Sequence, residues 1–256
     1  NAANPSGSPL APVEGTVHMY GCAAAHSVYA DENTAIWVSK VRKGLSRVIA
    51  LEGMSLKFLS TPQIDRILNQ EGTTLDTARA FGVRVAGHLF YLLTLPTLAI
   101  TLVCDVETGM WSEWNSDNGT TESYFTGLGA CNADGKAYVL DEDNGKVYEM
   151  DFDIYQDDTQ DINVEIVSGL WDGGSSRNKF IHRIGIVGDE QTSTCNITLN
   201  TTSDDYQNWG NSRTIDLSTT NPCANQFGRF QRAGFRIQHA ANTPLRLEAL
   251  DISYTL

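Results

Sequence analysis

Acidic side chains supply the first candidates for chemistry in this sequence. The segment 141–145 (DEDNG) places Asp141 and Asp143 at alternate positions before Gly145, as in the first part of a calcium-binding loop. It lacks the remaining ligand positions, and an Asn-Gly pair between two strand-like runs is typical of a hairpin turn. The pattern favours the turn and leaves calcium binding as the minor alternative.

Paired carboxylates are a second possibility, because glycoside hydrolysis needs an acid and a base across one bond. Five further aspartates on two polar loops could supply such a pair: Asp157, Asp158, Asp161, Asp204 and Asp205. The chain holds 31 Asp and Glu against 18 Lys and Arg, a formal charge of −13, so acidic clusters are expected from composition alone. Composition therefore favours solvated loops over a catalytic pair.

The residue types of a nucleophilic triad occur close together in His26, Ser27 and Asp31. There is no Gly-x-Ser-x-Gly elbow, and adjacent residues on a strand point to opposite faces. Three other histidines lie in strand-like segments with no His or carboxylate at ligand spacing: His88, His182 and His239. We therefore expect no catalytic residue, no metal site and no cofactor.

Aromatic side chains could form a stacking platform for sugars, the candidates being Trp111, Trp114 and Trp171. Strand positions three apart face opposite ways, so Trp111 and Trp114 cannot line one groove without a bulge. Core packing is the favoured interpretation. The sequons at Asn118, Asn196 and Asn200 matter only if the chain is secreted by a eukaryote.

Cysteine usage gives no metal or redox motif. The five cysteines are irregularly spaced and contain no C-x-x-C pair: Cys22, Cys104, Cys131, Cys195 and Cys223. Free buried thiols in a reducing compartment are favoured, and a single Cys195–Cys223 disulfide stays open.

The charge argues against sequence-independent binding to a phosphate backbone. A basic cluster near the C-terminus is expected to occupy alternate strand positions and to pair with surface carboxylates: Arg229, Arg232, Arg236 and Arg246. No apolar run approaches the roughly 18–20 residues that span a bilayer. No signal peptide is visible and the chain begins at Asn1, so we expect a processed chain or part of a longer polypeptide.

These candidates are carried by a chain whose pattern predicts an all-β fold. Residues 1–15 are rich in Pro, Gly and small residues and predict a linker or extended arm. Residues 35–40 and 47–53 flank a basic loop and predict a hairpin. One short helix is expected at 62–70, with Ser60 or Thr61 as its cap and Pro62 in its first turn. Apolar runs, turns and strands then recur through 79–152, so residues 16–155 predict propeller-like antiparallel blades.

The Asp-rich segment 151–161 predicts a connecting loop or domain boundary. Residues 156–256 predict a C-terminal antiparallel, sandwich-like region, because turn residues separate six strand-like segments: 162–171, 179–188, 193–202, 212–219, 232–240 and 245–256. Nothing resembles βαβ alternation, which excludes a doubly wound parallel sheet.

Four segments in this order resemble a known family: STPQIDRIL, GHLFYLLTLPTLAITLVCDVETGMWSEW, DNGKVYEMDFD and FRIQHAANTPLRLEALDI. Together they are similar to the packaged-DNA stabilisation or tail hub proteins of short-tailed bacteriophages, with the Asp105–Trp111 element as the most specific part. A complete propeller of about 40-residue blades needs more chain than residues 16–155 provide. The resemblance therefore implies the C-terminal part of such a protein or a reduced variant.

This resemblance also implies a structural, non-enzymatic virion protein, made in the host bacterial cytoplasm. It would form a ring-like homo-oligomer in the tail hub or head–tail connector and close or extend the DNA channel after packaging. Its expected partners are portal or adaptor proteins above and tail needle or fibre proteins below. Packaged double-stranded DNA would pass nearby without tight binding, and no membrane is involved.

Two rival functions remain open from the sequence. One is a carbohydrate-binding or glycan-cleaving β-propeller that acts as a receptor-binding protein, which requires exposed Trp and convergent carboxylates. The other is a bacterial surface or secreted adhesion module, which would favour the Cys195–Cys223 disulfide.

Overall fold

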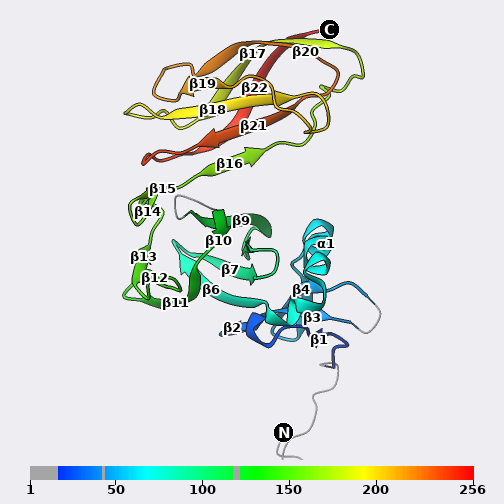
Figure 1. The fold of residues 1–256 in the computed structure, drawn as a ribbon, viewed down its shortest axis with the longest axis vertical. Helices are drawn as coiled ribbons and strands as arrows, with labels where there is room; N and C mark the ends of the chain where they lie inside the picture. The colour runs from blue at the N-terminus through cyan, green and yellow to red at the C-terminus, as the bar shows by residue number, and fades with distance from the viewer. Residues whose placement is uncertain (1–16, 42–43, 118–121) are drawn as a thin grey trace, which may run out of the picture. The chain divides into compact units, whose positions relative to one another are not determined.

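The computed structural model describes residues 17–41, 44–117 and 122–256. Contacts divide the chain into two units, Asn1–Phe152 (unit 1) and Asp153–Leu256 (unit 2), which are coloured blue to green and green to red in Figure 1. The predicted arm 1–15 and the sequon at Asn118 lie outside the described residues.

Unit 1 begins with a five-stranded antiparallel sheet in the order β1-β3-β4-β5, with β2 also paired to β3. Its strands are β1 (Gly21–Cys22), β2 (Tyr29–Asp31), β3 (Thr34–Lys40), β4 (Arg47–Glu52) and β5 (Ser55–Phe58). A 3-10 helix, η1 (Ala25–Ser27), separates β1 from β2. The predicted hairpin is confirmed, because β3 and β4 pair from Thr34↔Glu52 to Ser39↔Arg47.

The predicted helix is confirmed as α1 (Pro62–Glu71), one residue longer than expected. The Thr61 hydroxyl accepts a hydrogen bond from the Ile64 amide, and Pro62 occupies a position where a missing N–H costs nothing. Gly72, at φ +69°, ends the helix and leads into the 3-10 helix η2 (Gly72–Thr77). Figure 1 shows α1 beside β4, and its buried Ile64 and Leu68 belong to the core of unit 1.

The second sheet of unit 1 is a five-stranded meander with the order β10-β9-β8-β7-β6. Its strands are β6 (Arg79–Val85), β7 (His88–Leu95), β8 (Ile100–Asp105), β9 (Met110–Asp117) and β10 (Glu122–Tyr124). One face, including Tyr91 and Leu93, packs on the core that α1 and the first sheet share. The other face, including Leu92 and Val103, packs with Ala137 of the third sheet. Burial on both faces explains why β7 is apolar at consecutive positions instead of alternating.

The third sheet contains β11 (Gly127–Ala133), β12 (Lys136–Asp141) and β13 (Val147–Met150), in that order. The Asn144-Gly145 pair lies in the turn between β12 and β13, which confirms the predicted hairpin.

Unit 2 opens with a small hairpin of β14 (Gln156–Asp157) and β15 (Gln160–Asp161), within the segment that was expected to be a loop. Two antiparallel sheets follow, with orders β16-β21-β18-β19 and β20-β17-β22. Their strands are β16 (Val164–Val167), β17 (Lys179–Gly188), β18 (Asn196–Thr202), β19 (Arg213–Asp216), β20 (Cys223–Phe230), β21 (Gly234–His239) and β22 (Leu247–Thr255).

Side chains from both sheets form one core in unit 2, including Ile184 of β17, Leu199 of β18 and Phe235 of β21. The two sheets form the two layers seen in Figure 1. The all-β expectation, with meander sheets followed by a sandwich-like region, is therefore confirmed. Among the described residues, no helix has the length and apolar character needed to cross a membrane.

Candidate functional site

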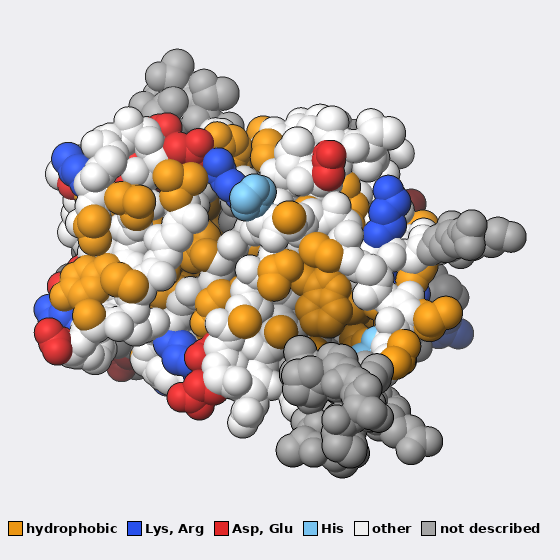
Figure 2. Space-filling model, turned by 90° about the horizontal axis from the view of Figure 1, so that it is seen from below, with side chains coloured by type: hydrophobic (Ala, Val, Ile, Leu, Met, Phe, Trp, Pro, Cys, Tyr) orange, Lys and Arg blue, Asp and Glu red, His pale blue; other side chains and the backbone are white. Residues whose placement is uncertain are grey.

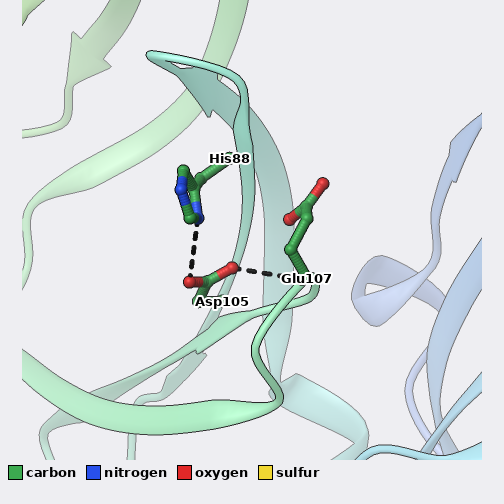
Figure 3. Close-up of side chains that lie close together, drawn as sticks. All are labelled: His88, Asp105 and Glu107. Carbon is green, nitrogen blue, oxygen red and sulfur yellow. Dashed lines mark hydrogen bonds and ion pairs between the residues drawn. The ribbon is translucent and has the colours of Figure 1, made fainter.

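Three titratable side chains meet at one end of the second sheet, as Figure 3 shows. His88 opens β7, Asp105 ends β8, and Glu107 lies in the turn before β9. His88 Nδ1 lies 3.0 Å from Asp105 Oδ2, and one ligand-type atom of each residue lies within 4.8 Å of the others. In the part of the chain that the structure describes, no other group of His, Cys, Asp and Glu meets that spacing. Sequence spacing gave no sign of this contact, because Asp105 reaches His88 only through the pairing of β7 with β8.

Hydrogen bonds within the protein already occupy these carboxylates. Asp105 Oδ1 accepts from the Glu107 amide at 3.1 Å, and Oδ2 accepts from the Thr108 hydroxyl at 2.9 Å. Burial raises the pKa of Asp105, but the hydrogen bonds from Thr108 and His88 outweigh it and hold that pKa below its usual range. Glu107 Oε2 accepts from the Leu89 amide at 2.8 Å.

A positively charged side chain also lies beside the cluster: Arg84 Nη1 is 3.9 Å from Glu107 Oε1. A metal ion would have to displace the existing hydrogen bonds next to this guanidinium. The arrangement is better suited to fixing the β8–β9 turn against β7 than to holding an ion.

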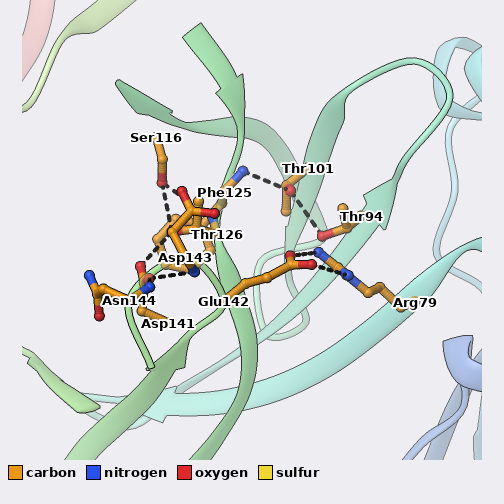
Figure 4. A network of polar contacts seen from close by, with 10 residues as sticks. All are labelled: Arg79, Thr94, Thr101, Ser116, Phe125, Thr126, Asp141, Glu142, Asp143 and Asn144. Carbon is orange, nitrogen blue, oxygen red and sulfur yellow. Dashed lines mark hydrogen bonds and ion pairs between the residues drawn. The ribbon is translucent and has the colours of Figure 1, made fainter. Parts of the chain in front are cut away.

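A second polar network joins the second and third sheets of unit 1 (Figure 4). Arg79 of β6 forms a two-point ion pair with Glu142, which follows β12, and Nη1 lies 3.2 Å from Oε1. Thr101 of β8 accepts a hydrogen bond from the Phe125 amide at 3.1 Å and shares another with the buried Thr94 at 3.0 Å. These contacts fix the chain between β10 and β11 onto the preceding sheet.

Asp141 lies in this network as a turn residue. Its Oδ1 accepts from the amides of Asp143 and Asn144, and its Oδ2 accepts from the Thr126 hydroxyl at 2.6 Å. Both carboxylate oxygens therefore stabilise the hairpin, which leaves the calcium alternative without its first ligand.

The residues considered as a triad are not assembled as one. Ser27 is buried, its hydroxyl donates to the Ala24 carbonyl at 2.8 Å, and it accepts from the Val38 amide at 3.0 Å. Asp31 pairs with Arg84 at 2.7 Å, and His26 is exposed. The Ser27 hydroxyl therefore forms its hydrogen bonds with backbone atoms and is not paired with a general base.

The five loop aspartates have separate local interactions. Asp161 accepts a hydrogen bond from the Gln156 side chain at 3.1 Å, and Asp204 accepts one from the Asn208 side chain. Asp205 forms an ion pair with Arg232 at 3.1 Å. Asp157 and Asp158 have interactions as well. None of the five belongs to the cluster of His88, Asp105 and Glu107 described above.

The tryptophans considered for sugar stacking pack on cores. Trp111 packs on the first core of unit 1, and its indole N–H donates to the Leu59 carbonyl at 2.9 Å. Trp114 packs on the opposite face of the second sheet, against Phe90 and Phe125. Trp171 packs on the core of unit 2. The core-packing interpretation is confirmed for all three.

The other histidines and sequons also have structural positions. His182 lies 3.0 Å from the Thr255 hydroxyl, and the buried His239 lies 3.2 Å from the Asn196 carbonyl. Asn200 is buried and donates to the Gly210 carbonyl, so it cannot carry a glycan in the folded protein, whereas Asn196 is exposed.

The C-terminal arginines do not share one strand, which corrects the expectation. Arg229 lies on β20 and Arg236 on β21, where its guanidinium stacks 4.5 Å from the Trp209 ring centroid. Arg232 pairs with Asp205, and Arg246 lies 3.4 Å from Asp189, so the expected carboxylate pairing holds for these two.

All five cysteines are free thiols, so the possible Cys195–Cys223 disulfide is not formed. Their burial differs from the expectation. Cys104 and Cys195 are buried, but Cys22 and Cys131 are exposed.

Comparison with known proteins gives one family, and the solved structures that it matches include two that are only distantly similar. A family model described as bacteriophage P22 Gp10, β-propeller, matches residues 3–155. No curated protein matches the chain. An exo-β-1,3-galactanase from Phanerochaete chrysosporium is 8% identical over 93% of this chain, with a TM-score of 0.24, and the chain spans 57% of its length. A glycoside hydrolase is 10% identical over 88% of this chain, with a TM-score of 0.25, and the match covers 69% of the hydrolase's own length. Likenesses this weak carry no argument about function.

Proposed function

The chain belongs to the bacteriophage P22 Gp10 β-propeller family, and from this premise we propose that it is a tail hub or head–tail connector protein of the virion. Membership makes it a bacteriophage structural protein. In the proposed role, several copies form a ring below the portal, close or extend the DNA channel after packaging, and anchor needle or fibre proteins.

The proposal that several copies assemble into a ring rests on the open sheet edges of unit 1. The first sheet ends in β5 and the third in β13, and neither strand has an outer partner among the residues that the structure describes. Met54, beside β5, is 65% exposed, and Val147 of β13 is 62% exposed. Open edges flanked by apolar side chains are templates for pairing, which a neighbouring subunit would cover. Groups of hydrophobic side chains between charged ones are visible on the face drawn in Figure 2.

The negative net charge supports the proposed role of the ring as a channel for DNA. A ring with −13 per chain repels the phosphate backbone, so the genome can slide past without being held. We expect no tight binding of the purified protein to duplex DNA at about 0.15 M salt. Strong binding under those conditions would contradict the channel role.

Native mass spectrometry with negative-stain imaging tests the assembly. We expect a closed ring, or ring formation when a portal or adaptor protein is added. The variant Val147→Lys places a charge on the β13 edge and should lower the oligomeric mass. The matched control is Val187→Lys, since Val187 is exposed on the central strand β17 of its sheet and should leave the ring intact. A persistent monomer that binds no tail component would refute the proposal.

A further inference from the structure

A polar groove of about 470 Å³ opens in unit 2, between the loop that joins β18 to β19 and the strand β20. Its lining includes Asp204, Asn208, Trp209, Arg213, Gln226 and Phe227. The volume falls in the range of small-molecule sites, which combine aromatic walls with a few placed polar groups.

The aromatic wall is held in a fixed orientation. Arg236 of β21 stacks on the Trp209 ring at 4.5 Å from its centroid, and Tyr206 lies 6.0 Å away. The Tyr206 hydroxyl donates to the Ser168 carbonyl at 2.9 Å, which ties the loop to the chain after β16. Because Arg236 covers one face of the indole, the apolar face of a sugar ring would stack on the opposite face.

The polar wall presents both donors and acceptors. Asp204 accepts from the Thr202 hydroxyl at 2.7 Å and from the Asn208 amide N–H and side chain, so its orientation is fixed. Together these hydrogen bonds lower the pKa of Asp204 to about 2, and the bond from the Asn208 backbone N–H has the largest effect. Asp204 is therefore a charged acceptor at neutral pH. Arg213 donates to the Gln226 carbonyl at 3.3 Å.

Unfavourable backbone conformations accompany these side chains. Gln226, which lines the groove, has φ +65°, and Asp205 and Tyr206, which follow the lining residue Asp204 in the chain, have φ +56° and φ +67°. Non-glycine residues rarely adopt this region, and such positions concentrate at binding sites. At Gln226 the strand β20 bulges against β17, which aims the lining residues Gln226 and Phe227 differently from a regular strand.

We propose that this groove binds a neutral pyranose unit of an oligosaccharide, stacked on Trp209 with its hydroxyls paired to Asp204, Asn208 and Gln226. A pyranose ring offers an apolar face and a rim of hydroxyls that both donate and accept, which matches the two walls. A purely apolar ligand would leave the polar wall unpaired, and a phosphate-rich ligand would meet Asp204 in an acidic protein. Glycan recognition goes beyond the proposed hub role and does not depend on ring formation.

The test uses the full chain on a printed array of neutral bacterial surface oligosaccharides, with free neutral disaccharides as a second arm. The glycan that gives the strongest array signal is then titrated into the protein by isothermal calorimetry. We expect Trp209→Ala to weaken binding at least about tenfold, equivalent to about 1.4 kcal/mol. Gln226→Gly is the second variant: it removes the amide while glycine accepts the positive φ, so it should weaken binding without lowering the melting temperature.

The matched control is Phe180→Ala, which removes an exposed aromatic ring of unit 2 outside the groove and should bind as the wild type does. Binding to the array without binding of free disaccharides assigns a longer surface glycan as the ligand, whereas equal binding of both assigns a ligand no larger than a disaccharide. Absence of binding in both arms, or wild-type affinity in both groove variants, would overturn the proposal. Phosphorylated glycans and duplex DNA are printed on the same array for comparison, and a preference for either would overturn the neutral-sugar assignment.

Discussion

The ring of Tyr29 in β2 lies directly against Gly82 of β6, so that a Cβ at Gly82 would meet three ring atoms at 2.3–2.6 Å. This contact brings the first and second sheets of unit 1 together. The buried Tyr91 of β7 reinforces it, because its hydroxyl donates to the Ser27 carbonyl at 2.7 Å. The absence of a side chain at Gly82 is therefore a packing requirement between two sheets.

Gly82→Ala should destabilise unit 1 by about 1–3 kcal/mol, because the added methyl must displace the Tyr29 ring from a packed position. Denaturant unfolding measures the change. The matched control is Gly129→Ala on β11, where a Cβ would meet nothing within 4 Å. A Tyr29→Ala background should remove most of the Gly82→Ala effect, and equal costs in both backgrounds would contradict the contact.

Arg79→Ala should destabilise the junction of the second and third sheets by about 1–2 kcal/mol, because it breaks a two-point ion pair with Glu142. The two side chains are only 26% and 32% exposed, which limits screening by solvent. Lys57→Ala is the control: its single contact with Glu52 is 3.8 Å long and largely exposed, so less than about 0.5 kcal/mol is expected. Equal losses would show that the junction does not depend on the pair.

Stability should decrease in acid partly through Asp204. Its pKa is about 2 in the folded protein and about 3.9 when unfolded, so its stabilising contribution is fully present above about pH 4. That contribution is lost as the pH falls towards 2. The unfolding free energies of wild type and Asp204→Asn should therefore differ at pH 7 and converge between pH 4 and 2. A difference between wild type and Asp204→Asn that stays constant from pH 7 to pH 2 would contradict this contribution of Asp204.

Thiol labelling should divide the cysteines by burial. Burial raises the pKa of Cys104 to about 12, so this thiol is both inaccessible and protonated at pH 8. Mass spectrometry after brief alkylation should find label on the exposed Cys22 and Cys131, and on the buried Cys104 and Cys195 only after unfolding. Rapid native labelling of Cys104 would contradict the packing of β8, and a missing thiol after unfolding would indicate a disulfide.

Local sequence patterns were sufficient for most strands and for α1. The helix follows from a cap, a proline and an apolar spacing within eleven residues, and the β12–β13 hairpin follows from Asn144-Gly145. By contrast, β20 was missed. Its sequence CANQFGRF contains Asn and Gly and a bulge at Gln226, so only pairing with β17 makes it a strand.

The sequence by itself determined the all-β class, the order of the elements and the resemblance to the phage family, because alternation, turn residues and short motifs act over a few neighbouring positions. Only the tertiary structure decided which side chains meet. His88 and Asp105 are far apart in the chain and are joined by the register of β7 and β8, and Trp209 and Arg236 come from a loop and another strand. Such contacts depend on strand register and on loops folding back over sheets, where a shift of one residue turns every side chain to the other face.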